Sequence, residues 1–321
     1  MVLSVKRHRV AIVILTVTPN PAVDLTWEVD RIEIGGTHRA DTGRVRAGGK
    51  GLNVARVAHA QGFEVQALTT YGGATGDELR ADLESGGVPH VLLPVSAATR
   101  RSVAWVDRSL GDTTIVNERG ISPNREEWAQ FVGAVYEQAA SASVVVIAGS
   151  FPPGSPEGLL EALLAAAGER PIIVDTSGDA LLAAADAGVA VLKPNRAELA
   201  EATGIADPIE GARELLQRGA GLVLLSLGAE GMLAVTADGI TRARLPQALA
   251  GNPTGAGDAA VAAACTLLDS GVWDTEAILR RATAWSAAAV LMPLAGEISP
   301  QHSRIEAELI VETLSTEKDA E

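Results

Sequence analysis

Short runs of consecutive apolar residues alternate along the chain with stretches whose apolar residues recur every three to four positions. The first run, residues 10–17, is rich in β-branched side chains and ends at Pro19 and Pro21, which predicts a buried strand. Similar runs occupy residues 65–70, 144–148, 172–174, 189–192 and 222–227. Helical periodicity is found in residues 51–61, 76–85, 125–141, 156–167, 180–187, 196–203 and 208–218. Strands alternating with helices predict right-handed βαβ units, and hence an α/β fold whose mostly parallel sheet is covered on both faces.

Two segments, approximately residues 25–46 and 99–119, depart from this rhythm because polar and apolar side chains alternate in them. Such alternation predicts antiparallel strands with one face in water. Both segments are too short for an independent domain, so we predict one small sheet that projects as a lid or a dimer interface. Residues 10–321 would form one domain, mainly helical beyond Asp258, and residues 1–9 a tail.

Composition and charge narrow the class of protein. Of the 321 residues, 47% are hydrophobic and 21% charged, as expected for a globular core, and the net charge is −14. An acidic surface repels nucleic acid and anionic membranes, and no apolar run reaches the roughly 18 residues that span a bilayer. Cys265 is the only cysteine, so no internal disulfide can form and a cytoplasmic location is expected.

The strongest candidate for catalysis is the sequence Gly255-Ala-Gly-Asp258, which precedes an alanine-rich helix. Gly255 and Gly257 allow close backbone approach, and a helix that begins here directs free N–H groups and its positive dipole end at the loop. Together with Ala256 they favour an anion hole for a phosphate in transfer, beside which Asp258 can deprotonate a hydroxyl. A tight turn with Asp258 as the helix N-cap would also explain the pattern.

A second glycine-rich segment, Gly48-Gly-Lys-Gly-Leu-Asn53, precedes a predicted amphipathic helix. Backbone N–H groups around Gly49 and Lys50, with the Asn53 amide, could bond the hydroxyls of a sugar. The spacing is neither that of a Walker A loop nor that of a dinucleotide-binding fingerprint, which argues against a Rossmann oxidoreductase. An ordinary glycine-rich helix start remains an alternative.

Two more candidate segments follow predicted strands. Pro194 ends one strand and begins a helix, where Asn195 and Glu198 lie three residues apart and suit Mg²⁺ bound through water. Helix capping would also explain this pair. The next strand leads into the glycine-containing loop 226–231, a place where open α/β sheets bind ligands, although a plain β-turn would look similar.

Four single residues complete the candidates. Asp24 follows the first strand and could accept hydrogen bonds from sugar hydroxyls, and Ser150 follows another strand. Arg39 and Arg100 lie in the two lid segments and could bind a phosphate, although most arginines are solvated surface residues. The histidines have no zinc-ligand spacing, and the Gly-x-Ser-x-Gly sequence of hydrolases is missing.

These segments occur together and in order, and the combination resembles the ribokinase-type, or phosphofructokinase B, carbohydrate kinases. The resemblance covers about residues 10–294. Its markers are Thr18-Pro-Asn-Pro-Ala-Val-Asp24, Ala47-Gly-Gly-Lys-Gly-Leu-Asn53, Gly149-Ser-Phe-Pro-Pro-Gly154, Asp175-Thr-Ser-Gly178, Lys193-Pro-Asn195, Ser226-Leu-Gly-Ala-Glu-Gly231 and Gly255-Ala-Gly-Asp258.

The resemblance implies a Rossmann-like, doubly wound core with a β lid that also forms a homodimer interface. It implies ATP with Mg²⁺, with Asp258 as base and Gly255, Ala256 and Gly257 in the anion hole. ATP would contact Lys193, Asn195, Ser226, Leu227, Gly228, Ala229, Glu230, Gly231 and Gly257. The sugar phosphate would contact Asp24, Arg39, Gly49, Lys50, Asn53, Arg100, Ser150 and Asp258. Glu198 would place the metal through water.

The sequence Gly-Gly-Lys-Gly resembles the branch of 1-phosphofructokinase and tagatose-6-phosphate kinase, so fructose 1-phosphate is the expected substrate. Thr37 stands where the minor 6-phosphofructokinase would have a lysine, which weakens fructose 6-phosphate. Asn252-Pro-Thr254 replaces a more usual polar run, which leaves activation by a monovalent cation open. Tagatose 6-phosphate or fructose 6-phosphate, a nucleoside or neutral sugar, and a non-catalytic sugar-phosphate sensor remain alternatives.

Overall fold

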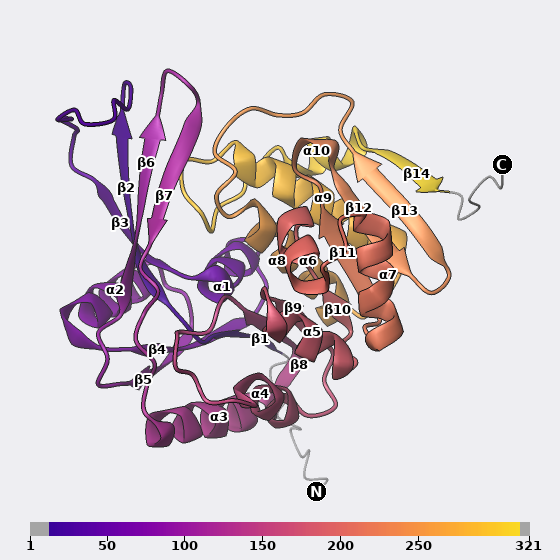
Figure 1. Ribbon diagram of the computed structural model, residues 1–321, viewed down its shortest axis with the longest axis horizontal. Helices are drawn as coiled ribbons and strands as arrows, with labels where there is room; N and C mark the ends of the chain where they lie inside the picture. Colours follow the sequence, from indigo (N-terminus) through magenta and orange to yellow (C-terminus); the bar gives the residue numbers. More distant parts are fainter. Residues whose placement is uncertain (1–12, 315–321) are drawn as a thin grey trace, which may run out of the picture.

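The computed structural model describes residues 13–314, so the predicted tail, residues 1–9, lies outside the described residues. A ten-stranded sheet runs through the molecule, and a four-stranded sheet stands beside it (Figure 1). The ten strands are, in spatial order, β14 (Ile310–Leu314), β13 (Gly239–Arg244), β12 (Met232–Thr236), β11 (Leu222–Ser226), β10 (Val191–Leu192), β9 (Ile172–Asp175), β8 (Ala142–Ala148), β1 (Val13–Thr18), β4 (Val65–Tyr71) and β5 (His90–Pro94). All pairings from β5 to β11 are parallel, which confirms the predicted α/β fold.

Helices cover both faces of this sheet because successive side chains of a buried strand point to opposite faces. In β1, Ile14 belongs to one hydrophobic cluster, and Leu15 and Val17 belong to the other. The first cluster is closed by α1 (Lys50–Ala60), α2 (Gly73–Ser85), α8 (Ala256–Asp269), α9 (Thr275–Val290) and α10 (His302–Ala307). The second is closed by α3 (Arg125–Ala139), α4 (Leu159–Ala167), α5 (Asp179–Asp186), α6 (Arg196–Thr203) and α7 (Pro208–Arg218).

Helix α8 is rich in alanine because it is buried on all sides. Every residue from Asp258 to Leu268 is buried, and α8 packs against α1, α9 and β8. Small side chains let these neighbours approach closely, and Cys265 is one of the small core residues. Within residues 13–314, no helix combines the length and apolarity that crossing a bilayer requires.

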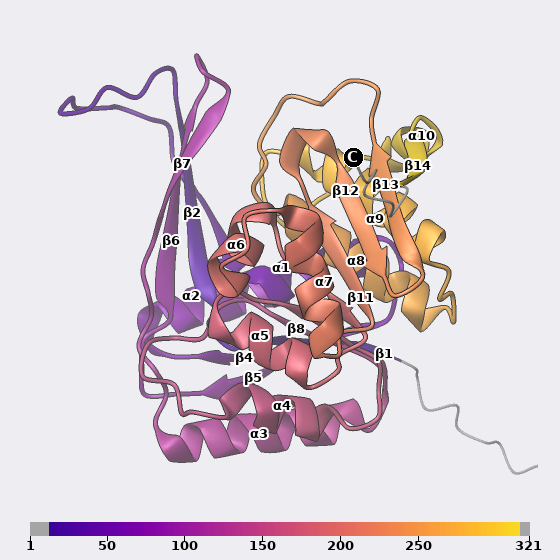
Figure 2. The same ribbon diagram turned by 45° about the vertical axis from the view of Figure 1, so that its right-hand side comes forward.

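The four-stranded sheet is the predicted lid, and its strands project beyond the main sheet from a base at α2 (Figure 2). It comprises, in order, β3 (Arg44–Gly48), β2 (Ala22–Val29), β6 (Arg100–Asp107) and β7 (Asp112–Asn117). The outer pairings are antiparallel as predicted, but β2 and β6 pair in parallel. The reason is topological: both strands follow parallel strands, β1 and β5, and so leave the main sheet in the same direction.

The C-terminal part differs from the prediction in one further respect. The chain beyond Asp258 is mainly helical, but it ends in β14, which pairs antiparallel with β13 at the edge of the main sheet. Residues of β14 are half-buried or exposed, so the strand has no continuous apolar run to mark it. The sheet therefore ends in an antiparallel edge, which is common in otherwise parallel sheets.

Candidate active site

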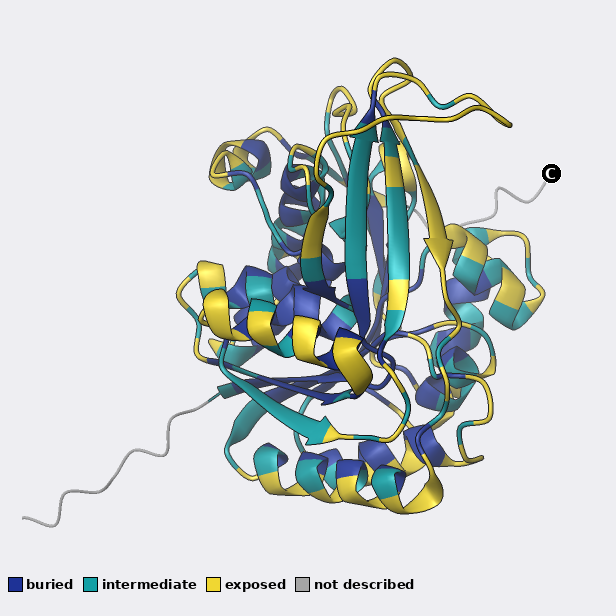
Figure 3. Cartoon of the chain, turned by 90° about the vertical axis from the view of Figure 1, so that its left-hand side faces the viewer, coloured by how far each residue is buried: buried dark blue, intermediate teal, exposed yellow. Residues whose placement is uncertain are grey.

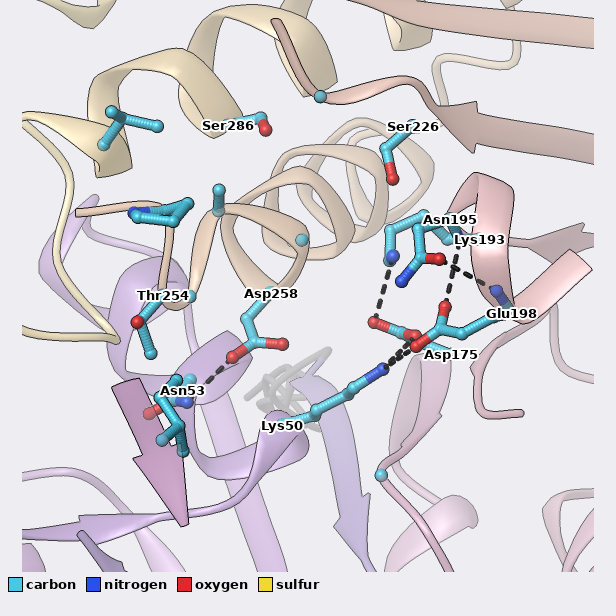
Figure 4. Close-up of a pocket in the computed structure, with 18 of the residues that line it drawn as sticks. Lys50, Asn53, Asp175, Lys193, Asn195, Glu198, Ser226, Thr254, Asp258 and Ser286 are labelled. Atoms are coloured by element: carbon cyan, nitrogen blue, oxygen red, sulfur yellow. Dashed lines mark hydrogen bonds and ion pairs between the residues drawn. The ribbon is translucent and has the colours of Figure 1, made fainter. Parts of the chain in front are cut away.

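A cavity of about 1050 Å³ lies at the carboxyl ends of the parallel strands, next to the lid (Figure 4). Open α/β sheets bind ligands at this edge, because loops from several strands meet there. The strand ends contribute Asn20 after β1, Ser150 after β8, Asp175 at the end of β9, Lys193 after β10 and Ser226 at the end of β11. The lid contributes Asp24 and Arg100, so one wall of the cavity belongs to each sheet.

Helix α8 begins at the cavity. Its N-cap is Gly255, whose φ of 83° lies in the left-handed region that favours glycine, and a Cβ there would come within 2.8 Å of Ala295. Gly255, Ala256 and Gly257 all line the cavity, so the free N–H groups of the first turn lie at its wall. The alternative in which Asp258 is the N-cap is wrong, because Asp258 lies inside the first turn.

The Asp258 carboxyl group is buried and is held by α1. Nδ2 of Asn53 donates a hydrogen bond of 2.7 Å to Oδ2 of Asp258. Burial raises the pKa of Asp258 to about 6, Asp175 raises it as well, and Lys50, Asn53 and Lys193 act in the opposite direction. At neutral pH this carboxyl group is ionised, yet it is a stronger base than an exposed aspartate.

Two lysines and two carboxylates form an ionic cluster on the opposite wall (Figure 4). Nζ of Lys50 lies 2.8 Å from Oδ1 of Asp175 and 3.3 Å from Oε1 of Glu198. Nζ of Lys193 lies 3.4 Å from Oδ2 of Asp175. Burial opposes the charge of Asp175, but Lys193 and Lys50 together hold its pKa below the ordinary value.

The pair Asn195 and Glu198 forms a capping box at the start of α6. The Asn195 side chain accepts a hydrogen bond from the Glu198 N–H, and the Glu198 carboxylate accepts one from the Asn195 N–H, both at 2.9 Å. The capping alternative is therefore confirmed. Both side chains also line the cavity, so capping holds them in place beside a ligand.

The end of the cavity under the lid is built around Asp24 and Arg100. Burial raises the pKa of Asp24 to about 7, although Arg100 opposes the shift. Burial also lowers the pKa of Arg100, whose guanidinium donates hydrogen bonds to the backbone oxygens of Asn20 and Glu118. Asn20 in turn donates a bond of 3.2 Å to the Ser150 hydroxyl. A cation, a carboxyl group and a hydroxyl thus meet at this end.

Three of the predicted site residues do not line the cavity. Arg39 lies in the exposed loop between β2 and β3. In the loop 226–231, Ser226, Gly228, Ala229 and Gly231 line the cavity, but Leu227 and Glu230 do not. Glu230 instead forms ion pairs with arginines at the surface.

Sequence reasoning assigned no role to Asp175 and Asn20, although both line the cavity. Asp175 is 1% exposed and is the shared partner of Lys50 and Lys193. The signal was present, because each residue follows a predicted strand at the edge where the other candidates lie. The ion pairs of Asp175 with two lysines that are distant in the sequence depend on the order of the strands in the sheet. The local sequence does not specify that order.

Comparison with known proteins places the chain in a family. Residues 18–302 match the model of the pfkB family of carbohydrate kinases. The chain is 35% identical over 309 residues to a 1-phosphofructokinase of Xanthomonas campestris, which covers 92% of this chain and 97% of that protein. The chain belongs to the pfkB family of carbohydrate kinases. It is therefore an ATP-dependent sugar-phosphate kinase, as its buried aspartate beside a helix N-terminus suggests.

Two further relatives support the same class of enzyme. An ATP-dependent 6-phosphofructokinase isozyme 2 of Mycobacterium tuberculosis is 35% identical over 288 residues, covering 87% of this chain and 84% of that protein. The structure of a tetrameric inhibited form of phosphofructokinase-2 from Escherichia coli superposes with a TM-score of 0.84. It is 30% identical and covers 92% of this chain and 98% of that one.

The residues of this kinase fit a metal ion that arrives with the nucleotide. Among residues 13–314, no three His, Cys, Asp or Glu side chains are grouped as a metal cage. Glu198 nevertheless lines the cavity, with its side chain 20% exposed. Mg²⁺ commonly keeps several waters and binds one or two carboxylates plus substrate phosphates, so such a wall suits it.

Proposed function

We propose that this kinase transfers the γ-phosphoryl group of ATP to a hydroxyl of fructose 1-phosphate, giving fructose 1,6-bisphosphate. The observation that carries the proposal is the buried Asp258 carboxyl group, held by Asn53 beside the first turn of α8. The relatives named 1-phosphofructokinase support this choice of sugar phosphate. Fructose 6-phosphate is the nearest alternative, because other relatives carry the name 6-phosphofructokinase.

In the proposed reaction, the Asp258 carboxylate accepts the proton of the attacking hydroxyl as the new O–P bond forms. The bond from the γ-phosphorus to the bridging oxygen breaks, and ADP leaves. The N–H groups of the first turn of α8, around Gly255 and Gly257, would stabilise the charge on the transferred group. Mg²⁺ held through water by Glu198 would neutralise phosphate charge.

The ATP side of the cavity is proposed to be the wall formed by the ends of β10 and β11. Lys193, Asn195 and the lining residues of the loop 226–231 lie there. The sugar side would be the end under the lid, where Arg100 supplies a cation for the sugar's own phosphate. Asp24 and Ser150 would bond its hydroxyls. Arg39 lies outside this cavity, so the proposal does not use it.

The outer face of the lid is proposed to be a homodimer interface. Val45, Trp105 and Val116 belong to β3, β6 and β7, and the strand register, which runs through β2, places them on one face of the lid sheet. They are 51%, 42% and 53% exposed. In Figure 3 the projecting strands of the lid are coloured mostly as intermediate or exposed. Contiguous exposed apolar faces commonly mark protein–protein interfaces.

A coupled assay of ADP release with MgATP tests the proposal against fructose 1-phosphate, fructose 6-phosphate, tagatose 6-phosphate and fructose. We expect the highest kcat/KM for fructose 1-phosphate.

In Asp258→Asn, kcat should fall at least about a hundredfold with little change in KM, because the lost interaction acts in the transition state. Near-normal turnover by this variant would remove Asp258 as the base, and a preference for another sugar would change the substrate.

A further inference from the structure

The two lysines among residues 13–314 both lie beside the carboxylate of Asp175. The sequence contains Lys6, Lys50, Lys193 and Lys318, and every other side chain with a permanent positive charge is arginine. Of these lysines, only Lys50 and Lys193 fall within residues 13–314, and both form ion pairs with Asp175. An ammonium is a compact point charge, whereas a guanidinium is a broad planar group. Compact cations are thus concentrated at this one carboxylate.

The two lysines differ in their access to the cavity. The Lys193 side chain is 3% exposed, and a Cβ on Gly257 would lie 3.1 Å from its Nζ, so it is fixed beside the anion hole. The Lys50 side chain is 33% exposed and comes from the first residue of α1. Both lysines line the cavity, and Lys50 is the more exposed of the two.

Helix α1 connects Lys50 to the proposed base. Lys50 and Asn53 are three residues apart and lie on one face of α1. Asn53 bonds Asp258, while Lys50 bonds Asp175 and Glu198. A single helical turn thus supports both the aspartate that would accept the proton and the cation between the other two carboxylates.

The Lys50 ammonium lies between two carboxylates, an arrangement that is also typical of a bound divalent metal ion. Oxygens from β9 and α6 approach it at 2.8 and 3.3 Å. The second oxygen of Asp175 is buried and lies 3.4 Å from Nζ of Lys193, so each oxygen of this carboxylate faces one lysine. Carboxylate oxygens are the ligands that divalent metal ions such as Mg²⁺ prefer.

We propose that Lys50 serves as a built-in cation that takes the place of a protein-bound divalent metal ion between Asp175 and Glu198. The inference rests on the proposed function, in which the metal ion arrives with ATP and reaches Glu198. With Lys50 in position, the free kinase has no need of a metal ion at this wall. Lys50 thereby positions the two carboxylates before the nucleotide binds.

The test measures metal binding without nucleotide. Mn²⁺ is titrated into wild type and Lys50→Met at neutral pH, and free Mn²⁺ is followed by electron paramagnetic resonance. Removing the ammonium leaves Glu198 without a cation and Asp175 with Lys193 alone, so this wall gains one negative charge. Lys50→Met should therefore bind Mn²⁺ at least about tenfold more tightly than wild type. The added substitution Glu198→Gln should abolish this gain.

Arg196→Met is the matched control, because it removes a cation from a surface carboxylate, Glu230, to which it is paired at 2.8 Å. This variant should bind Mn²⁺ like wild type. Lys50→Met binding no more tightly than wild type would overturn the proposal, and so would a gain that survives Glu198→Gln. A lysine that only stabilises the fold would lower the melting temperature of Lys50→Met and give no new metal site.

Lys50→Gln is a second variant, which keeps a hydrogen-bond donor for Asp175 in case Lys50→Met fails to fold. It should gain the same Mn²⁺ site, and its kinase rate should keep rising with free Mg²⁺ after ATP is saturated, unlike that of wild type. Parallel Mg²⁺ curves would also overturn the proposal. Its failure is separable from that of the proposed function, because wild-type turnover of fructose 1-phosphate does not depend on these variants.

Discussion

The chemistry of single side chains in this kinase is set by burial at the carboxyl edge of the sheet. Asp258 and Asp24 are both carboxyl groups that burial makes harder to ionise, with pKa values of about 6 and about 7. Asp175 is more buried than either, at 1% exposed, yet its pKa is lowered because two lysines contact it. The three aspartates of this cavity thus have different affinities for a proton. Burial raises the affinity of Asp24 and Asp258, whereas the two lysines lower that of Asp175.

The pH dependence of the reaction follows from Asp258. A base must be ionised, and a carboxyl group with a raised pKa loses its charge as the pH falls through that value. We expect kcat/KM for the sugar phosphate to decrease below about pH 6 and to approach a tenfold loss per pH unit. Steady-state assays between pH 5 and 9 would measure this limb. Asp24→Asn is the control: if the acid limb disappeared in that variant, the titration would belong to Asp24.

Among the secondary-structure elements, β3 shows how a strand can shape the sugar end of the cavity. A Cβ added to Gly48 would overlap the carboxyl group of Asp24 on the paired strand β2. Gly48→Ala should therefore displace this side chain and raise KM for the sugar phosphate about tenfold, with a smaller effect on KM for ATP.

Gly133→Ala is the control for an added methyl group, because a Cβ there meets no atom within 4 Å and lies in α3, far along the chain. This variant should leave both KM values unchanged and raise thermal stability slightly, since alanine favours a helix. Equal KM values for Gly48→Ala and wild type would show that Asp24 does not contact the sugar.

The elements were predictable where local physics determines them. The buried strands and most helices lie within a few residues of their predicted bounds, because continuous apolar runs and capping residues such as Asn195 mark them. The parallel pairing of β2 with β6 was not predicted, because pairing depends on where each strand leaves the main sheet. For the same reason, Asp175 was seen as a marker but not as the partner of Lys50 and Lys193.

At the scale of the whole molecule, the site assembles residues that are far apart in the sequence. Asp24 and Arg100 come from the lid, Lys50 from α1 and Asp258 from α8, and all line one cavity. The motifs identified these residues, but only the fold shows that they lie around one cavity. Arg39 shows the limit of motif reasoning, since a residue in a lid segment need not face the cavity of its own chain.

The lid also determines the proposed assembly. Because Trp105 lies on the exposed outer face of the lid sheet, a charge placed there should prevent two such faces from packing together. We expect wild type to sediment as a dimer and Trp105→Glu as a single chain at the same micromolar concentration. Tyr136→Glu is the control, because Tyr136 is 70% exposed on α3, away from the lid, and this variant should remain dimeric. A wild type that sediments as a single chain would disprove the interface, and a dimeric Trp105→Glu would place it elsewhere on the molecule.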